Sequence, residues 1–424
     1  MVISKRSPGV WFSLLTVLAA VVAIPQVQAE RWWSDSVEKA LSRAGTNRAA
    51  LAPMLERTPE SQREGMTFLF ENMPEIDLVT LDAGLIATNT ALAYEAMSTA
   101  PWAKQIPPDV FLNDILPYAC INELRDSWRP RLRELALPLI KGCTSPGEAA
   151  RRINERLFPL VNVKYSTKRR KPDQSPLESI ESGMATCTGL SVLLADACRA
   201  VGIPARIVGT PLWINLRGNH TWVEVWDGDW HFAGAAEPDP AGLDRGWFVH
   251  DASQAKRDEP RHAIYASSFR RSGTAFPMVW ARDIHWVPAV NVTDRYTPKS
   301  QAKADGKIRL LVKVLDQPAG RRVKADVSLG DLTDPSHVGT GVSREETADM
   351  NDILPFEVVP GHRYVVMASA GWEANHLQVT ATDAREQVIV VSLSPRTTLS
   401  HPSQACYLPS ANSRVATPRP LPRP

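Results

Sequence analysis

Apolar residues recur every three or four positions along much of the chain before residue 160. Val37, Ala40 and Leu41 follow this spacing. A second run consists of Leu132, Leu135, Ala136, Leu139 and Ile140. This period is typical of helices with one buried face, although Pro138 should kink or end the second run. The pattern therefore predicts a helical domain over residues 30–160.

The pattern changes near residue 179, where a different order of elements begins. Helical periodicity runs over residues 187–200, and Gly202 stands where a residue just after a helix would. Residues 203–208 have the composition of a strand. Polar and apolar residues then alternate over 221–226, before an Asp-Gly pair at 227–228 and another short run. A two-residue Asp-Gly loop between such runs indicates a β-hairpin.

The last third of the chain has the pattern of a β domain. Residues 300–307 are small and polar, as in a linker. Apolar runs separated by turn residues follow at 308–315, 323–329, 356–359, 364–368 and 387–393. They predict a β-sandwich-like domain over residues 306–394. Residues 395–424 are rich in Pro, Ser and Arg, so we expect a disordered tail. The predicted fold class is α+β.

The first 29 residues have the features of a signal peptide. Lys5 and Arg6 precede an apolar stretch over 10–24, and Val27-Gln28-Ala29 matches a small-x-small cleavage site. The apolar stretch is shorter than the roughly 20 residues that a membrane span needs. We expect a secreted or periplasmic protein that starts near Glu30, without stable membrane insertion after cleavage. A retained N-terminal anchor is the alternative.

Composition narrows the function classes. The chain has 48 Lys and Arg against 46 Asp and Glu, so no nucleic-acid partner is expected, and the basic stretch at 167–173 fits a solvated loop. The 5 cysteines leave at least one unpaired, and Cys120 could pair with Cys143. The sequence contains no CxxC pair and no HExxH motif, so we expect no metal and no other cofactor.

Cys187 has the sequence context of a nucleophile. Its thiol must ionise near neutral pH, whereas free thiols have a pKa of about 8.5. A helix N-terminus lowers that pKa through its unpaired N–H groups, which can also hold an oxyanion. Residues 183–190 give a small, flexible approach, and Cys187 begins the predicted helix. The alternative is a buried structural thiol, the role that we assign to Cys198 on the same helix.

His220 is the candidate base, which must come within about 3 Å of the sulfur. It begins the first hairpin strand, and a strand packed on the Cys187 helix could present it to the thiol. Asn219 is either a turn residue or a polar neighbour of His220. Trp213, in the preceding loop, is the candidate for lining a substrate cleft. The tryptophans expected in the core rather than on a substrate platform are Trp222, Trp226 and Trp230.

The stretch over 179–251 resembles the transglutaminase-like superfamily. It contains the Cys187 helix, Gly-Ile-Pro-Ala-Arg at 202–206, Asn-His-x-Trp-Val-Glu-Val at 219–225 and the following Asp-Trp strand. The resemblance implies a transglutaminase-like core over 161–299 and a papain-like Cys–His–Asp arrangement, with Cys187 and His220 in the first two positions. Members of the superfamily include protein crosslinkers, peptidases and peptide N-glycanase-like amidases, all working through a thiol.

The third position departs from the family pattern. The family aspartate usually lies four residues after the tryptophan of the second hairpin strand, and Gly234 holds that place here. The orienting carboxylate is then missing or supplied by Glu237, Asp239 or Asp251, of which we prefer Glu237. An amide or a backbone carbonyl could also orient the imidazole.

These residues predict a thiol acyl-transfer enzyme that acts on protein or peptide amides through an acyl-enzyme on Cys187. Hydrolysis, by a cysteine peptidase or amidase, is expected in preference to crosslinking. The alternative is a catalytically impaired binding or scaffold protein with its interaction surface on the β-sandwich. Gly234 at the usual aspartate position motivates that alternative.

Overall fold

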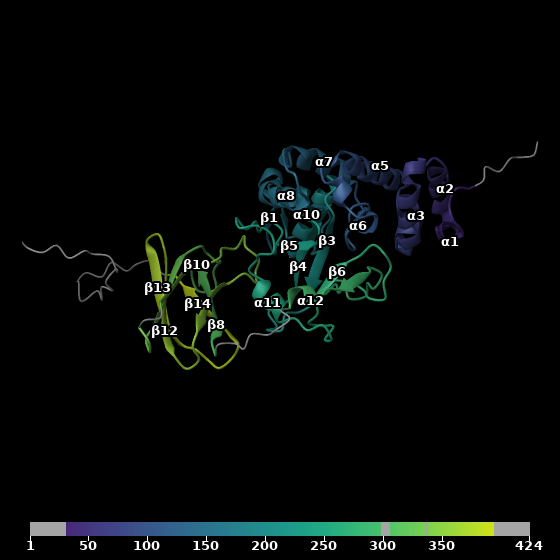
Figure 1. Ribbon diagram of the computed structural model, residues 1–424. Coiled ribbons are helices and arrows are strands. Elements are labelled where there is room, and N and C mark those ends of the chain that lie inside the picture. Colours follow the sequence, from purple (N-terminus) through teal and green to yellow (C-terminus); the bar gives the residue numbers. More distant parts are fainter. Residues whose placement is uncertain (1–30, 298–305, 336–337, 394–424) are drawn as a thin grey trace, which may run out of the picture.

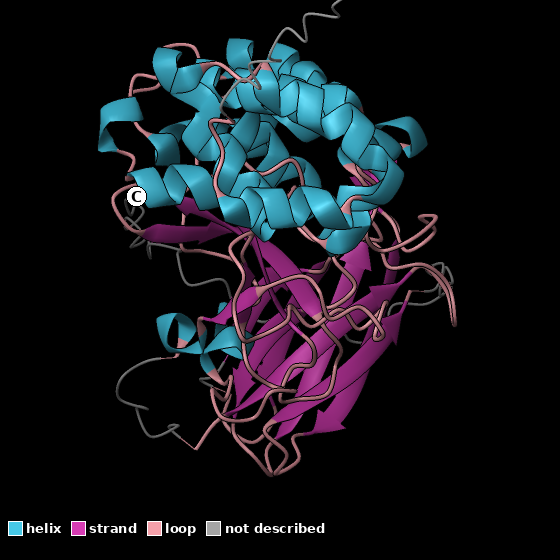
Figure 2. Ribbon diagram, turned by 90° about the vertical axis from the view of Figure 1, so that its right-hand side faces the viewer, coloured by secondary structure: helices cyan, strands magenta, loops and turns pink. Residues whose placement is uncertain are grey.

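The computed structural model describes residues 31–297, 306–335 and 338–393 (Figure 1). The predicted signal peptide, the predicted tail and most of the predicted linker lie outside the described residues. Helices dominate the first part of the chain, a mixed region follows, and strands dominate the last part. Most helices gather at one end of the molecule and the sheets lie beneath them (Figure 2). The α+β class predicted from the sequence is confirmed.

The first part of the chain folds into helices that bury the apolar faces predicted from the sequence. They are α1 (Asp35–Arg43), α2 (Arg48–Glu56), α3 (Arg63–Asn72), α4 (Glu75–Thr80), α5 (Ala83–Thr99), α6 (Pro108–Asp114), α7 (Trp128–Leu139) and α8 (Pro146–Val161). α1 buries Val37, Ala40 and Leu41. α7 ends one residue after Pro138, in agreement with the expected effect of that proline. In the described part of the chain, no helix has the length and apolar character to cross a membrane.

Arg129 of α7 holds several segments of this region together. It is 2% exposed, and its guanidinium donates to the carbonyl oxygens of Arg199 (2.8 Å), Ile115 (2.7 Å) and Pro117 (3.0 Å). Its Nε donates to Asn89 Oδ1 at 2.7 Å. Burial lowers the pKa of this guanidinium to about 9. The carbonyl oxygens that surround it are what make a cation tolerable at this depth.

Replacing Arg129 with methionine should destabilise the protein by about 3 kcal/mol or more, because three buried carbonyls would each lose a donor at a cost of roughly 1–3 kcal/mol. Urea unfolding of the full chain, followed by tryptophan fluorescence, measures the change. Arg131→Met is the matched control on the same helix, since that side chain is 52% exposed. Its effect should stay within about 0.5 kcal/mol. Equal effects of the two substitutions would contradict the role given to Arg129.

The middle of the chain contains a five-stranded antiparallel sheet with the order β5-β4-β3-β6-β7. Its strands are β3 (Ala205–Thr210), β4 (His220–Trp226), β5 (Trp230–Ala233), β6 (Tyr265–Ser267) and β7 (Ala289–Asn291). The helix α10 (Cys187–Ala200) packs against β3 and β4. Short elements complete this region: β1 (Lys164–Tyr165), α9 (Pro176–Ser182), β2 (Met184–Ala185), α11 (Val249–Ser253) and α12 (Thr293–Tyr296). The predicted cysteine helix and the predicted hairpin are therefore in contact.

The hairpin differs from the prediction only in its turn. β4 and β5 pair with Trp226 opposite Trp230, so residues 227–229 form a loop of three rather than two residues. Gly228 has a φ of +84°, which favours glycine there. On the neighbouring strand pair, Arg206 lies opposite Glu224 and forms a buried ion pair of 2.6 Å. These pairings fix the register that puts His220 at the first position of β4.

The last part of the chain forms two sheets that pack face to face, with the orders β10-β9-β12-β13 and β11-β8-β14. The strands are β8 (Ile308–Leu315), β9 (Asp326–Asp331), β10 (Val338–Val342), β11 (Leu354–Val358), β12 (Arg363–Ala370), β13 (Glu373–Thr380) and β14 (Glu386–Ser392). Sequence periodicity did not predict β10 and β13. Both strands are largely exposed, so they lack the alternation of buried apolar residues that marks the others.

Charged residues join this sandwich to the core. Arg309 on β8 lies 3.3 Å from Asp251 of α11, and these two elements are neighbours in Figure 1. Arg217, in the loop before β4, also pairs with Asp251 and lies 2.8 Å from Glu386 of β14. The two regions are therefore in direct contact, and loops of the sandwich can reach the site that the core carries.

Candidate active site

Cys187 is the first residue of α10 and follows the extended N-cap residue Thr186. Its thiol is partly buried, and the Thr221 backbone and the Thr188 side chain lie near the sulfur and act to lower its pKa. α10 packs against β4, whose first residue is His220. The structure thus brings together the two residues that the sequence predicts as nucleophile and base.

His220 is 2% exposed and is surrounded by aromatic rings. Those rings belong to Trp213, Trp222, Trp247 and Phe248. The ring of Trp247 is nearest, with its centroid 4.6 Å from that of His220. Among the residues that the structure describes, neither imidazole nitrogen has a hydrogen-bond partner. Aromatic packing alone therefore sets the orientation of this ring.

A third residue, Asp349, joins this pair from the β-sandwich. It lies in the loop between β10 and β11 and is 2% exposed. One ligand atom each of Cys187, His220 and Asp349 lies within 4.8 Å of the other two. Asp349 Oδ2 is 3.6 Å from His220 Nδ1. The sequence did not predict Asp349, which is far along the chain from the cysteine motif and comes close only through the docking of the sandwich.

Asp349 does not occupy the place of an orienting carboxylate. Such a carboxylate bonds the imidazole nitrogen remote from the sulfur, so it lies roughly 7 Å from the thiol across the ring. Asp349 instead has an oxygen within 4.8 Å of Cys187 Sγ. Its 3.6 Å separation from His220 Nδ1 also exceeds the length of an N–H···O hydrogen bond. The Asp349 carboxylate therefore faces the reactive side of the Cys187–His220 pair.

Contacts to the core hold the loop that carries Asp349. The Asp349 carboxylate accepts the Asn351 N–H at 2.8 Å, which shapes the loop locally. The Met350 N–H donates to the Tyr165 hydroxyl at 3.1 Å, and Arg217 donates to the Asn351 carbonyl at 2.6 Å. These bonds run from the loop to residues on both sides of the cysteine motif. The loop thus covers the site as an ordered part of the fold.

Glu237 occupies the space that a side chain at position 234 would take. A Cβ placed on Gly234 would overlap Glu237 Oε2 and lie 3.1 Å from Glu237 Cβ. Glu237 Oε2 also accepts the Trp247 Nε1–H at 3.0 Å, and Trp247 is the ring nearest to His220. Burial, followed by the charge of Asp349, raises the pKa of the Glu237 carboxyl well above its usual range. Glu237 therefore contacts His220 through Trp247 rather than through a hydrogen bond of its own.

The other two carboxylates considered from the sequence have different roles. Asp251 is buried and pairs with Arg217 and Arg309 at the contact with the sandwich. Asp239 accepts the Ala241 N–H at 2.8 Å in its own turn. In the part of the chain that the structure describes, neither Asp251 nor Asp239 forms an ion pair with His220.

Trp213 and Asn219 lie beside His220 but not where the sequence suggested. Trp213 is 1% exposed and stacks on Trp222 with a centroid distance of 6.1 Å. The expectation that Trp213 lines a substrate cleft is wrong, because the ring is buried between neighbouring rings, including those of His220 and Trp222. Asn219 is partly buried, and its carbonyl accepts the Asn351 amide at 3.4 Å. It therefore contributes to the contact with the covering loop.

The other described cysteines have structural positions. Cys198 is 0% exposed on α10, as expected for a core residue. Cys120 and Cys143 are both free thiols, so the disulfide considered from the sequence does not form between them. Cys406 lies outside the described residues. Cys187 is the one described free cysteine that is not fully buried.

The thiol of Cys187 is held in its neutral form. Burial raises its pKa to about 12, and the negative charge of Asp349 acts in the same direction. Hydrogen bonds from Thr221 and Thr188 lower the pKa by less. We expected the helix N-terminus to favour the thiolate, but burial and the nearby carboxylate outweigh it in this arrangement.

Similarity to known proteins covers the middle of the chain. Residues 133–252 match the transglutaminase-like superfamily, and no curated protein matches the chain. One similar solved structure is a provisionally assigned cysteine protease from Cytophaga hutchinsonii, with 23% identity over 27% of this chain and 40% of that chain, and a TM-score of 0.23. Another is red sea bream transglutaminase, with 10% identity over 66% of this chain and 65% of that chain, and a TM-score of 0.29. The chain thus spans less than two thirds of either protein.

The resemblance noted over residues 179–251 is therefore confirmed. The matched segment begins earlier than those motifs, within α7, and ends at α11. It contains Cys187, His220 and Glu237 but not Asp349. The chain carries a transglutaminase-like core within an α+β fold.

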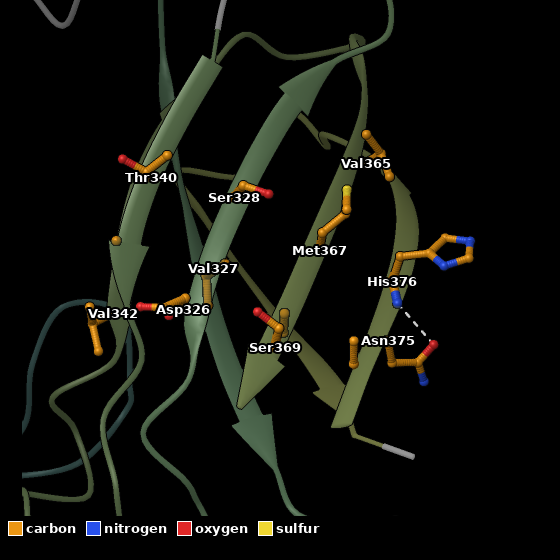
Figure 3. A pocket seen from close by; sticks show the side chains of 13 residues that line it. Asp326, Val327, Ser328, Thr340, Val342, Val365, Met367, Ser369, Asn375 and His376 are labelled. Atoms are coloured by element: carbon orange, nitrogen blue, oxygen red, sulfur yellow. Dashed lines mark hydrogen bonds between the residues drawn. The ribbon is translucent and has the colours of Figure 1, made fainter. Parts of the chain in front are cut away.

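A hollow on the sandwich lies apart from this site. It is on the face of the β10-β9-β12-β13 sheet that is turned away from the second sheet (Figure 3). Its lining includes Ser328, Thr340, Met367 and His376. Met367 is 54% exposed, which leaves an apolar side chain open to solvent there. This hollow is the surface that a binding role of the sandwich would use.

Proposed function

We propose that this protein is a thiol acyl-transfer enzyme, most simply a cysteine peptidase or amidase that cleaves protein or peptide amides. One observation carries the proposal. A partly buried thiol at a helix N-terminus has an imidazole nitrogen within 4.8 Å of its sulfur. Nucleophilic catalysis by cysteine needs a base that can come within hydrogen-bond reach of the thiol, and this proximity supports that role for His220.

In the proposed reaction, His220 takes the proton of Cys187 as the sulfur attacks the amide carbonyl. The N–H groups at the start of α10 stabilise the oxyanion. The amine then leaves with the proton from His220, and a thioester on Cys187 remains. Water, activated by the same imidazole, hydrolyses the thioester. Because the raised pKa keeps the resting thiol neutral, proton transfer accompanies the attack rather than preceding it.

We also propose that the enzyme works outside the cytoplasm, as a secreted or periplasmic protein. The support is the sequence of residues 1–29 with its small-x-small cleavage site. Determining the N-terminus of the protein exported from its natural host tests this proposal. A mature chain that starts near Glu30 is the expected result, and an uncleaved cytoplasmic chain would contradict it.

Alkylation of Cys187 by iodoacetamide tests the reactive thiol in buffer that contains a metal chelator. The Asp349→Asn variant should react several-fold faster at pH 7 than the wild type, because removing a nearby negative charge lowers the thiol pKa and raises the thiolate fraction. The rate of both proteins should rise with pH, since the pKa of about 12 lies far above neutrality. Mass spectrometry of the Cys187 peptide gives the rates.

Asp352→Asn is the matched control for this experiment. Asp352 lies in the same loop but pairs with Arg344 at 2.8 Å and is not in the Cys187 cluster. Its alkylation rate should equal that of the wild type. A rate in Asp349→Asn that matches the wild type at every pH would contradict the position given to Asp349.

The second candidate function is a binding protein whose working surface lies on the β-sandwich. The hollow lined by Ser328, Met367 and His376 is the observation that favours it (Figure 3). The two functions differ in one outcome. An enzyme accumulates a thioester on Cys187 with an activated aryl ester, whereas a binding protein that has lost turnover leaves this thiol unacylated.

A further inference from the structure

Cys187, His220 and Asp349 are three residue types that bind zinc, and they converge from three separate elements. Cys187 begins α10, His220 begins β4, and Asp349 belongs to the β10–β11 loop of the sandwich. Their ligand atoms lie within 4.8 Å of one another. Nitrogen and oxygen ligands on tetrahedral zinc, with bonds of about 2.0 Å, are about 3.3 Å apart. The 3.6 Å between His220 Nδ1 and Asp349 Oδ2 is close to that spacing and too long for a hydrogen bond.

The imidazole nitrogens at this cluster are free to coordinate. His220 is only 2% exposed, yet neither of its ring nitrogens has a hydrogen-bond partner among the described residues. A buried polar atom without a partner costs roughly 1–3 kcal/mol. A cation bound by the imidazole would remove that cost, and a nearby carboxylate and thiol supply the remaining ligands.

A second group of possible ligands, Cys120, Glu123 and Asp196, shows the contrast. There Cys120 Sγ donates to Asp196 Oδ1 at 3.3 Å, and Glu123 accepts the Cys120 N–H at 2.6 Å. Arg199 Nη1 lies 3.6 Å from Asp196 Oδ1, so a cation already stands beside this carboxyl group. Asp196 Oδ2 is the one carboxylate oxygen of this group without a hydrogen-bond partner among the described residues, but the Cys120 thiol and both Glu123 oxygens are already partnered, so the group has a weaker claim to a metal ion.

Charge also favours a divalent cation at the Cys187 cluster. Within the described residues, no lysine or arginine forms an ion pair with Asp349. A thiolate and a carboxylate together balance the two charges of Zn²⁺, and a neutral imidazole completes three protein ligands. A water molecule can take the fourth position, as in zinc sites with three protein ligands.

We propose that Cys187, His220 and Asp349 bind a thiophilic divalent cation, Zn²⁺, and that the bound ion holds the enzyme inactive. Binding displaces the thiol proton and engages the sulfur lone pair and the imidazole nitrogen that acyl transfer uses. Because Asp349 comes from the sandwich, the ion also links that region to the core. The inhibitory effect rests on the function proposed above, whereas the binding of the ion does not.

The test is a Zn²⁺ titration of the full mature chain after removal of metals, with a chromophoric chelator as competitor. We expect one Zn²⁺ per chain in the wild type and in Asp352→Asn. Asp349→Asn should bind at least about tenfold more weakly. Cys187→Ser, which keeps every other cysteine, should lose the tight site. Co²⁺ in place of Zn²⁺ should give a thiolate-to-cobalt absorption band that Cys187→Ser lacks.

Alkylation by iodoacetamide separates this proposal from the proposed function. Zn²⁺ should protect Cys187 in the wild type and in Asp352→Asn but much less in Asp349→Asn. Equal Zn²⁺ affinity in the wild type, Asp349→Asn and Cys187→Ser would overturn the metal site, and the acylation experiments would then still decide the enzymatic function. Tight binding that depends on Asp349, in a protein that never acylates Cys187, would uphold the metal site and overturn the enzyme.

Discussion

Replacing His220 with glutamine should slow acylation of Cys187 by about 10³-fold, within the range of roughly 10²–10⁴ that general-base catalysis contributes. The thiol is neutral in the resting arrangement, with a pKa of about 12, so attack depends on a base that removes its proton. Glutamine fills much of the space among the surrounding rings but cannot accept that proton. The measurement is the rate of acylation by an activated aryl ester, followed by mass spectrometry of the intact chain.

Two further variants serve as controls for the His220→Gln experiment. Cys187→Ala sets the baseline, because it removes the nucleophile and should give no acyl-enzyme. His231→Gln is the matched control, since His231 lies on the same hairpin but is partly exposed and pairs with Asp244 at 2.6 Å. It should acylate at the wild-type rate. Loss of less than about tenfold in His220→Gln would show that His220 is not the base.

Chemical rescue separates a catalytic from a structural role of His220. In a His220→Gly variant, added imidazole can enter the space left by the side chain and act as a base. The acylation rate should then rise with imidazole concentration and with the fraction of neutral imidazole. A structural defect would not respond to the added base in this way.

The sequence was sufficient for the parts of the site that local patterns determine. Cys187 begins a helix with clear apolar periodicity, and His220 begins a strand of a hairpin marked by Asp-Gly. Both signals lie within one short segment whose elements pack on each other. That is why the pair could be proposed before the fold was known.

Asp349 and Trp213 show what such patterns do not contain. Asp349 reaches the thiol only because Arg217 and Tyr165 hold its loop against the core, a contact between distant segments. No local spacing in the sequence encodes that docking. Trp213 was assigned to a cleft because it lies in a loop, but apolar residues of the core, among them Trp222 and Phe248, bury it. The first difference arises from how the sandwich sits on the core, and the second arises from packing within the core itself.

The second large effect on the acylation rate is expected from replacing Glu237, which fills the space beside Gly234. Glu237→Ala should lower the acylation rate by about 10²-fold, because Trp247 loses its hydrogen bond and no longer fixes the His220 ring, and misplaced catalytic groups cost about that much. Glu237→Gln should stay within about fivefold of the wild type. An amide oxygen can still accept the Trp247 N–H, and glutamine has nearly the same size and shape as glutamate, so the contact that holds the Trp247 ring is kept.

The double variant Gly234→Asp with Glu237→Ala should recover most of the lost rate. A side chain at position 234 would enter the space that Glu237 now fills, since its Cβ would lie 3.2 Å from Glu237 Cδ. Gly234→Asp alone should be impaired, because its carboxyl group would collide with Glu237. Recovery of the acylation rate in the double variant would show that the site needs one carboxyl group in this space. Either residue 234 or residue 237 could carry it. If Glu237→Ala and the double variant were equally slow, Glu237 would have no positioning role, and His220 would depend only on the rings that surround it.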